Sequence, residues 1–141
     1  MPITQAELKK IVAQRGKNLS KLDLRGINLE GINLSGFNFS RTNLEGANLR
    51  RATLIQTNFS KAFMKDVDLR DANLTEADLS WAKLLNANLK GTNLQRANLE
   101  DADLRDSNLE SADLQYATIE RTNLVGTNLK HITEPDGTKR Q

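Results

Sequence analysis

Carboxylates are the side chains of this sequence that could support acid–base chemistry, and six of them are crowded into one short stretch. General acid–base catalysis needs a carboxyl group whose pKa is shifted by an apolar pocket or by a close partner charge. Asp101 and Asp103 are expected on opposite sides of a bend, in solvent, without such a pocket. The sequence therefore predicts no catalytic carboxylate in this acidic stretch, which comprises Glu100, Asp101, Asp103, Asp106, Glu110 and Asp113, with Arg105 among them.

Other signatures of enzymes are also missing from the sequence. There is no cysteine, so the chain has no thiol nucleophile, disulfide or thiolate metal site. His131 is the only histidine, and a histidine without partner residues is typical of an exposed side chain rather than of a metal ligand or general base. No phosphate-binding loop, GxSxG, HExxH or calcium-binding repeat is present. We predict a protein that is not an enzyme and holds no metal or cofactor.

Charge and hydropathy exclude further classes of protein. The 141 residues carry 20 Lys and Arg against 18 Asp and Glu, a net charge of +2, so no overall field points to nucleic acid or to a membrane surface. The first residues lack the apolar core of a secretory signal, and no window approaches the roughly 18 apolar residues of a membrane span. These features predict a cytoplasmic protein that does not enter a membrane.

A five-residue repeat fills most of the chain. A first centre at Leu19 followed by steps of five gives 23 centres ending at Leu129, of which 19 are Leu. The residue before the centre is Asn in 14 repeats and Asp in five, and the residue two before it is Ala in 11 and Thr in five. A period of five fits neither a continuous strand nor a continuous helix. We predict short extended pieces that alternate with bends, so that every centre faces one axis.

A longer period predicts how many repeats make one coil. Serine recurs every 20 residues after the centre, and Lys21, Arg41 and Lys61 follow the same step, which indicates four repeats in each coil. The Asn and Asp side chains are expected to bond nearby backbone groups at the bends. Bends also favour residues with a permissive φ, and six of the eight glycines fall at the last position of a repeat. They are Gly26, Gly31, Gly36, Gly46, Gly91 and Gly126.

Segments such as ANLTEADLS and GTNLQRANLEDADLRD resemble the pentapeptide-repeat family. The resemblance covers residues 17–131, and the small size with a helical cap is similar to cyanobacterial members of the family. It implies an all-β solenoid, a right-handed quadrilateral parallel β-helix with the central Leu or Phe and the small residue inside.

Three parts are expected along the chain. Residues 1–16 form an N-terminal cap with a short α-helix, residues 17–131 form a β-helix of 23 repeats and nearly six coils, and residues 132–141 form a tail. Thr4 and Glu7 have the spacing of a capping box at the start of the helix.

The blunt C-terminal end needs a cover, either the folded-back tail or a second copy of the chain. The acidic stretch near that end would repel its copy in a two-fold dimer, which favours a monomer over a C-terminal homodimer.

Outward residues that depart from the repeat define the leading functional hypothesis. Phe63 and Lys83 replace Asn or Asp at equivalent places of successive coils, Leu85 lies two residues beyond Lys83, and Trp81 lies at the adjoining bend. We name Phe63, Trp81, Lys83 and Leu85 the interaction patch. Because aromatic anchors are typical of interfaces, the chain is predicted to be a rigid protein–protein interaction module with an unidentified protein partner.

Two alternatives involve nucleic acid. The resemblance implies the first, since quinolone-resistance members of the family are acidic DNA-like rods that bind DNA gyrase and inhibit or protect it. The net charges of the five 20-residue coils from Lys17 are +1, +2, −1, +2 and −5, so the fifth coil alone is strongly acidic, which argues against DNA mimicry. The second is direct binding through a basic stripe of Arg50, Arg51, Arg70 and Lys90, which is short and lacks interleaved aromatic residues. A solvated face is the simpler interpretation of that stripe.

Overall fold

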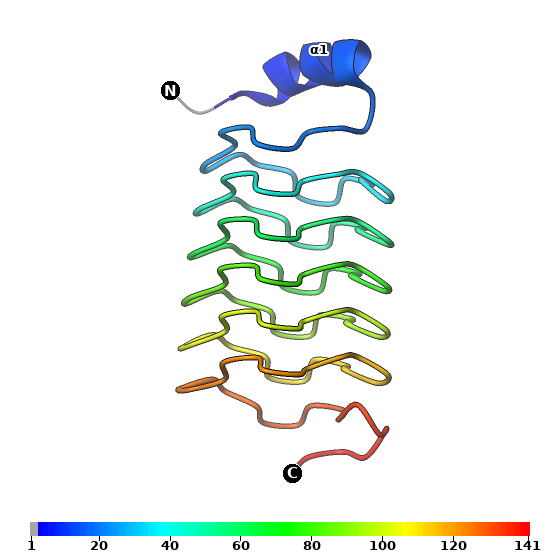
Figure 1. The fold of residues 1–141 in the computed structure, drawn as a ribbon, viewed down its shortest axis with the longest axis vertical. Helices are drawn as coiled ribbons and strands as arrows, with labels where there is room; N and C mark the ends of the chain where they lie inside the picture. The colour runs from blue at the N-terminus through cyan, green and yellow to red at the C-terminus, as the bar shows by residue number, and fades with distance from the viewer. Residues whose placement is uncertain (1–2) are drawn as a thin grey trace.

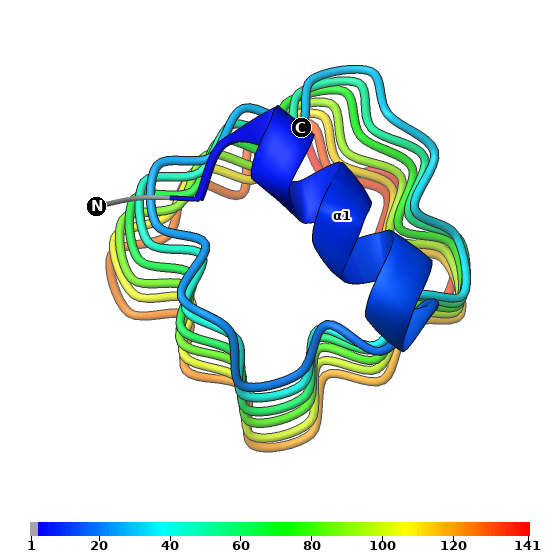
Figure 2. The same ribbon diagram turned by 90° about the horizontal axis from the view of Figure 1, so that it is seen from above.

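The chain winds into a stack of coils beneath one N-terminal helix in the computed structural model, which describes residues 3–141 (Figure 1). Parallel bridges join residues 20 apart, from Asn18 with Asn38 to Asp113 with Thr133, and they recur every five residues. Each coil therefore holds four repeats, which confirms the predicted period. Viewed along the stack, successive coils repeat the same outline, each with a small offset from the coil before it (Figure 2).

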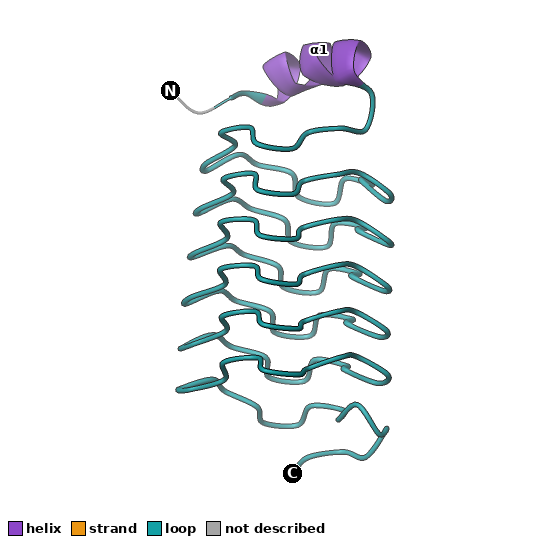
Figure 3. Cartoon of the chain, viewed as in Figure 1, coloured by secondary structure: helices purple, strands orange, loops and turns teal. Residues whose placement is uncertain are grey.

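The extended pieces of the repeats are very short. Within residues 3–141 each repeat contributes one bridged residue, and no longer strand is formed (Figure 3). The predicted β pairing is thus present as isolated parallel bridges rather than as continuous strands, because the chain turns again after every five residues.

The backbone of a typical repeat leaves no N–H group without a partner. In the five residues from Leu44 to Asn48, the N–H groups of Leu44 and Gly46 donate to the next coil, and the N–H of Asn48 donates to the preceding coil. The residue after Gly46 closes a turn by donating to the Leu44 carbonyl, 3.0 Å away. The fifth N–H, that of Glu45, donates to the side chain of Asn43 at 3.1 Å. This complete set of bonds stabilises a chain of short pieces that has no strands.

Every bend between repeats contains a residue with left-handed backbone conformation. The six predicted glycines have φ between 68° and 75°. The same conformation occurs at the other 17 bends, at non-glycine residues with φ between 55° and 64°. It costs an L-residue roughly 1–2 kcal/mol, and the hydrogen bonds between coils hold it in place. The sequence therefore predicted the conformation at too few of the bends.

The core is a column of central residues with the small residues beside them. The centres from Leu19 to Leu114 are buried, and Phe39 and Phe59 stack on successive coils with ring centroids 5.3 Å apart. The buried threonines satisfy their hydroxyl groups by donating to the carbonyl of a central residue 23 positions earlier, at 2.8 Å in the case of Thr42. The interior from Leu19 to Leu114 is thus filled by side chains.

The helix α1 (Gln5–Arg15) covers the N-terminal end of the stack (Figure 2). Its N-cap is Thr4, which forms a capping box with Glu7, and it ends at Gly16. The predicted helix is therefore present. Leu8 is its buried residue and packs into the core of the first coils, and Ile11 and Val12 pack against the same core.

The C-terminal tail folds back against the last coil. Thr133 forms a parallel bridge with Asp113 and an antiparallel bridge with Lys139, so the coil pattern continues beyond residue 131. Ile132 is only 2% exposed, and Arg140 Nε lies 2.7 Å from Glu134 Oε1. Between the tail and the half-buried last leucines of the core, a small cavity of about 70 Å³ remains.

Candidate interaction surface

A ladder of side-chain acceptors runs along all sides of the solenoid. Each of the 19 Asn and Asp residues that precede a centre accepts a hydrogen bond from the backbone N–H two positions later, at 2.8–3.3 Å. We name this set of bonds the polar ladder. It confirms the prediction that these side chains bond nearby backbone groups at the bends. Repeats with another residue before the centre lack this bond.

Two breaks in the polar ladder lie next to each other in the interaction patch. Phe63 and Lys83 occupy ladder positions and form a parallel bridge with each other. Neither side chain offers an acceptor, and in residues 3–141 the N–H groups of Lys65 and Leu85 donate to no protein atom. The patch therefore lies where two structural hydrogen bonds are missing.

The other two departures from the ladder lie elsewhere. At Thr53 the Ser35 hydroxyl replaces the missing acceptor and binds the N–H of Ile55 at 3.2 Å. Thr118 lies in the last, incomplete coil, where the central residue Ile119 is itself exposed. Among residues 3–141, the interaction patch is thus the only place in the interior of the stack where the side-chain acceptor is missing on two successive coils and no other group replaces it.

The side chains of the interaction patch share one side of the third and fourth coils. Phe63 is 50% exposed and Trp81 is 54% exposed, whereas Leu85 is half-buried. Trp81 lies at a bend with φ 61°, a conformation that bulky residues rarely adopt. The structure therefore places the predicted residues together, in positions that local stability does not favour.

Replacing Phe63 with Asn should stabilise the protein by about 1 kcal/mol, because the new side chain restores an acceptor for the Lys65 N–H. Urea unfolding followed by circular dichroism measures the change. The matched control is Asn43→Phe, which removes an existing rung one coil earlier and should destabilise by a similar amount. A lower stability of the Phe63→Asn variant would contradict the structural reading of the ladder.

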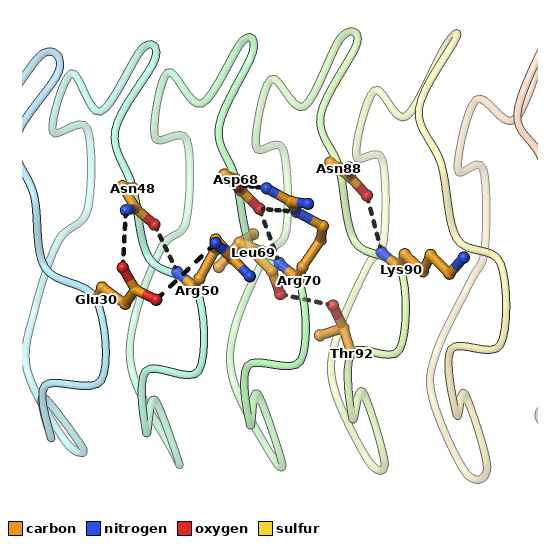
Figure 4. A network of polar contacts seen from close by, with 9 residues as sticks. All are labelled: Glu30, Asn48, Arg50, Asp68, Leu69, Arg70, Asn88, Lys90 and Thr92. Atoms are coloured by element: carbon orange, nitrogen blue, oxygen red, sulfur yellow. Dashed lines mark hydrogen bonds and ion pairs between the residues drawn. The ribbon is translucent and has the colours of Figure 1, made fainter.

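The predicted basic stripe is largely neutralised by the protein's own acids (Figure 4). Arg50, Arg70 and Lys90 do lie at equivalent positions of successive coils. Arg70 Nη2 lies 2.6 Å from Asp68, and its hydrogen bonds lower the pKa of the Asp68 carboxyl below the ordinary value. Lys90 lies 3.4 Å from Glu110, and Arg50 lies 4.0 Å from Glu30. Arg51 is exposed at the neighbouring bend rather than in this line.

The acidic stretch is partly neutralised by cations of its own and neighbouring coils. Hydrogen bonds from Arg121 lower the pKa of the Asp101 carboxyl, and Asp113 accepts a hydrogen bond from Gln95 at 2.6 Å. Asp106 forms no ion pair within residues 3–141 and is exposed. The ion pairs join Arg121 to Glu100 and Asp101, Arg105 to Asp103, and Lys90 to Glu110.

A group of unpaired cations beside the interaction patch was missed by the sequence analysis as a functional feature. Lys21, Arg41 and Lys61 stack at one bend of the first three coils, and Trp81 takes the same place in the fourth. We name these three residues the cation column. The 20-residue recurrence of these cations is the signal that could have located it.

The cation column borders a shallow hollow of about 430 Å³, in which Lys21 and Arg41 share the lining with Phe63. Asp23 also lies there, but it is bound by Arg25, whose hydrogen bonds lower the pKa of the Asp23 carboxyl to about 2. The hollow therefore carries net positive charge next to an exposed aromatic ring.

In the part of the chain from residue 3 onward, no group of three or more histidine, cysteine or carboxylate side chains is arranged to hold a metal ion. Over the same residues, no helix has the length and apolar character needed to cross a membrane. His131 is exposed at the last bend.

Comparison with known protein families finds one match, which covers most of the chain. The family described as pentapeptide repeats matches residues 18–54, 32–71, 72–110 and 92–130, with eight copies. No curated protein matches the chain.

Solved structures of similar architecture include two cyanobacterial proteins. The pentapeptide repeat protein Rfr23 from Cyanothece 51142 is 25% identical, with 92% of this chain and 97% of that chain covered and a TM-score of 0.49. The pentapeptide repeat protein alr5209 from Nostoc Pcc 7120 is 28% identical, with 92% and 99% covered and a TM-score of 0.40. Full-length QnrB1, a plasmid-mediated fluoroquinolone resistance protein, is 18% identical over 82% of this chain and 68% of that chain, with a TM-score of 0.50, a likeness of fold alone.

Proposed function

The chain belongs to the pentapeptide-repeat family, whose members are generally structural or interaction scaffolds rather than enzymes, and we propose that it binds a protein partner through the interaction patch. In this proposal the solenoid is a rigid, non-enzymatic, right-handed quadrilateral β-helix. Its core and polar ladder fix the shape, while the outward side chains carry recognition.

The interrupted polar ladder is the observation that carries this proposal. At Phe63 and Lys83 the chain lacks the acceptor found in 19 of its repeats, and the Lys65 and Leu85 N–H groups are left without a protein acceptor in the described residues. Departures from a locally consistent pattern are expected at functional sites, where stability is lost in exchange for another property. Here that property is an exposed pair of aromatic rings, the kind of anchor that protein interfaces favour.

The geometry does not favour mimicry of DNA as the function. A duplex mimic needs unpaired negative charge along its length. In this chain a large net negative charge occurs in one coil only, which holds six of the 18 acidic residues, and Asp101, Asp103 and Glu110 there are paired with arginine or lysine. The likeness to QnrB1 concerns the fold and adds nothing to the charge argument.

Affinity capture from an extract of the source cells tests the proposal. Wild-type protein should retain a partner that the double variant Trp81→Ser, Leu85→Ser loses. The control is Tyr116→Ser, Val125→Ser, which removes exposed apolar side chains of the last coils and should retain the partner. If no captured protein distinguishes the two double variants, the patch is not the binding site and the proposal fails.

A further inference from the structure

We infer that the partner presents a short acidic segment with an aromatic or aliphatic anchor to the interaction patch and the cations around it. This inference rests on the proposed function and specifies the chemistry of the partner. It follows from three features of one side of the solenoid: unpaired cations, unpaired backbone donors, and a boundary where the charge changes sign.

Five cations on this side have no acidic partner. They are the three residues of the cation column together with Lys65 and Lys83, and within residues 3–141 none of the five forms an ion pair. Cations of the basic stripe, such as Arg70 and Lys90, do have such partners. Positive charge that is not compensated within the molecule attracts an anionic ligand.

The backbone N–H groups that have no acceptor at the breaks in the polar ladder make the surface more specific for an acidic ligand. In an intact repeat, the N–H after the centre binds the oxygen of an Asn or Asp side chain, as Glu45 binds Asn43. The corresponding N–H groups of Lys65 and Leu85 lie on successive coils, about 4.8 Å apart. A partner carboxylate would supply the acceptor that the chain itself lacks there, and hydrogen bonds to charged acceptors are stronger than those to neutral ones.

The positive side ends abruptly toward the C-terminus. In the next coil Asp101 follows Trp81 at the bend, and Asp103 lies beside Lys83, to which its backbone is joined by a parallel bridge. A long polyanion that continued along the stack would meet these carboxylates. The observations therefore favour a short acidic segment of a protein over a nucleic acid strand, whose charge and base stacking extend over many nucleotides.

The exposed rings of Phe63 and Trp81 supply the apolar part of the surface. Both are about half exposed beside the cations, and the hollow that Phe63 shares with Lys21 and Arg41 is open to solvent. An apolar side chain of the partner can bury these rings while its neighbouring carboxylates contact the cations. Such a combination of aromatic anchor and charged rim is typical of protein interfaces.

Fluorescence anisotropy with a labelled dodecapeptide of Glu and Asp around a central Trp tests this inference on the full chain. The peptide should bind, and binding should weaken as salt screens the charges. The triple variant Lys21→Gln, Arg41→Gln, Lys61→Gln should weaken binding about tenfold or more. The control Arg51→Gln, Arg96→Gln, Lys130→Gln removes the same charge elsewhere and should change the affinity less than about twofold.

A second variant keeps the fold and removes the unpaired donors. Phe63→Asn with Lys83→Asn rebuilds the polar ladder, so we expect a more stable protein that binds the acidic peptide at least about tenfold more weakly. The inference is overturned if the peptide fails to bind at about 100 µM, if the two charge variants lose affinity equally, or if a labelled oligothymidylate of the same length binds more tightly. A captured partner that depends on Trp81 and Leu85 but not on the cation column would overturn the inference and leave the proposed function standing.

Discussion

Replacing Phe59 with Ala is expected to lower the free energy of unfolding by about 4 kcal/mol, because the ring is among the largest side chains of the core. The ring is fully buried in the third coil and stacks on Phe39 with an angle of 10° between the ring planes. Truncation removes a large apolar group and leaves a cavity that the coils above and below cannot close, because their backbones are tied together by hydrogen bonds. Urea unfolding monitored by circular dichroism measures the loss.

Two control variants separate the cavity from other effects of this substitution. Phe59→Leu places the commonest central residue at the same position and should cost less than about 1.5 kcal/mol. Leu129→Ala removes a centre that is only half-buried in the last coil, so its cost should be well below that of Phe59→Ala. Equal losses for Phe59→Ala and Leu129→Ala would show that burial along the stack does not determine stability.

Removal of residues 131–141 is expected to raise the mass of the protein in solution above that of the full chain, through formation of dimers or aggregates. Ile132 is buried by the tail, and the N–H groups of Leu114 and Tyr116 donate to the carbonyl groups of Thr133 and Pro135. A chain that ends at Lys130 exposes those donors together with the end of the core, which is an open edge for self-association. Light scattering after gel filtration detects the change in mass.

The point variant Ile132→Ser tests the same cap without shortening the chain. It should destabilise the protein by roughly 2–3 kcal/mol, the value of a buried aliphatic side chain, whereas Arg140→Ala removes only the ion pair with Glu134 and should cost less than about 1 kcal/mol. A truncated chain that stays monomeric and fully soluble would show that this end needs no cover.

The sequence predicted the core, the coil length and the helical cap because these depend on short, regular patterns. The five-residue recurrence of Leu indicates which side chains lie inside. The 20-residue recurrence of Lys21, Arg41 and Lys61 indicates that residues 20 positions apart stack on successive coils. It did not predict left-handed bends at residues other than glycine. That conformation depends on hydrogen bonds between coils, which overcome the local preference of each residue.

The charged surfaces were predicted less well, for a physical reason. Arg50 and Lys90 find their partners, Glu30 and Glu110, 20 residues away in the chain, on adjacent coils. The net charge of a single coil does not reveal such ion pairs, because each pair joins residues of two coils. The loss of an acceptor for the Lys65 N–H is equally invisible until the 19 Asn and Asp side chains that precede a centre are seen to accept a hydrogen bond from the backbone, as Asn43 does from the N–H of Glu45. The candidate residues could be named from the sequence, but their electrostatic environment could not.

Four repeats in each coil also govern how such a chain tolerates changes of length. Insertion of a single pentapeptide would preserve pairing, bends and core, yet it would rotate every later side chain by a quarter turn about the axis, so that Trp81 would no longer continue the line of Lys61. Insertion of 20 residues would lengthen the rod by about 4.8 Å and keep all faces in phase. The interior thus has a period of five residues, whereas the surface has a period of 20. A binding face that spans several coils is therefore preserved only by length changes that add or remove whole coils.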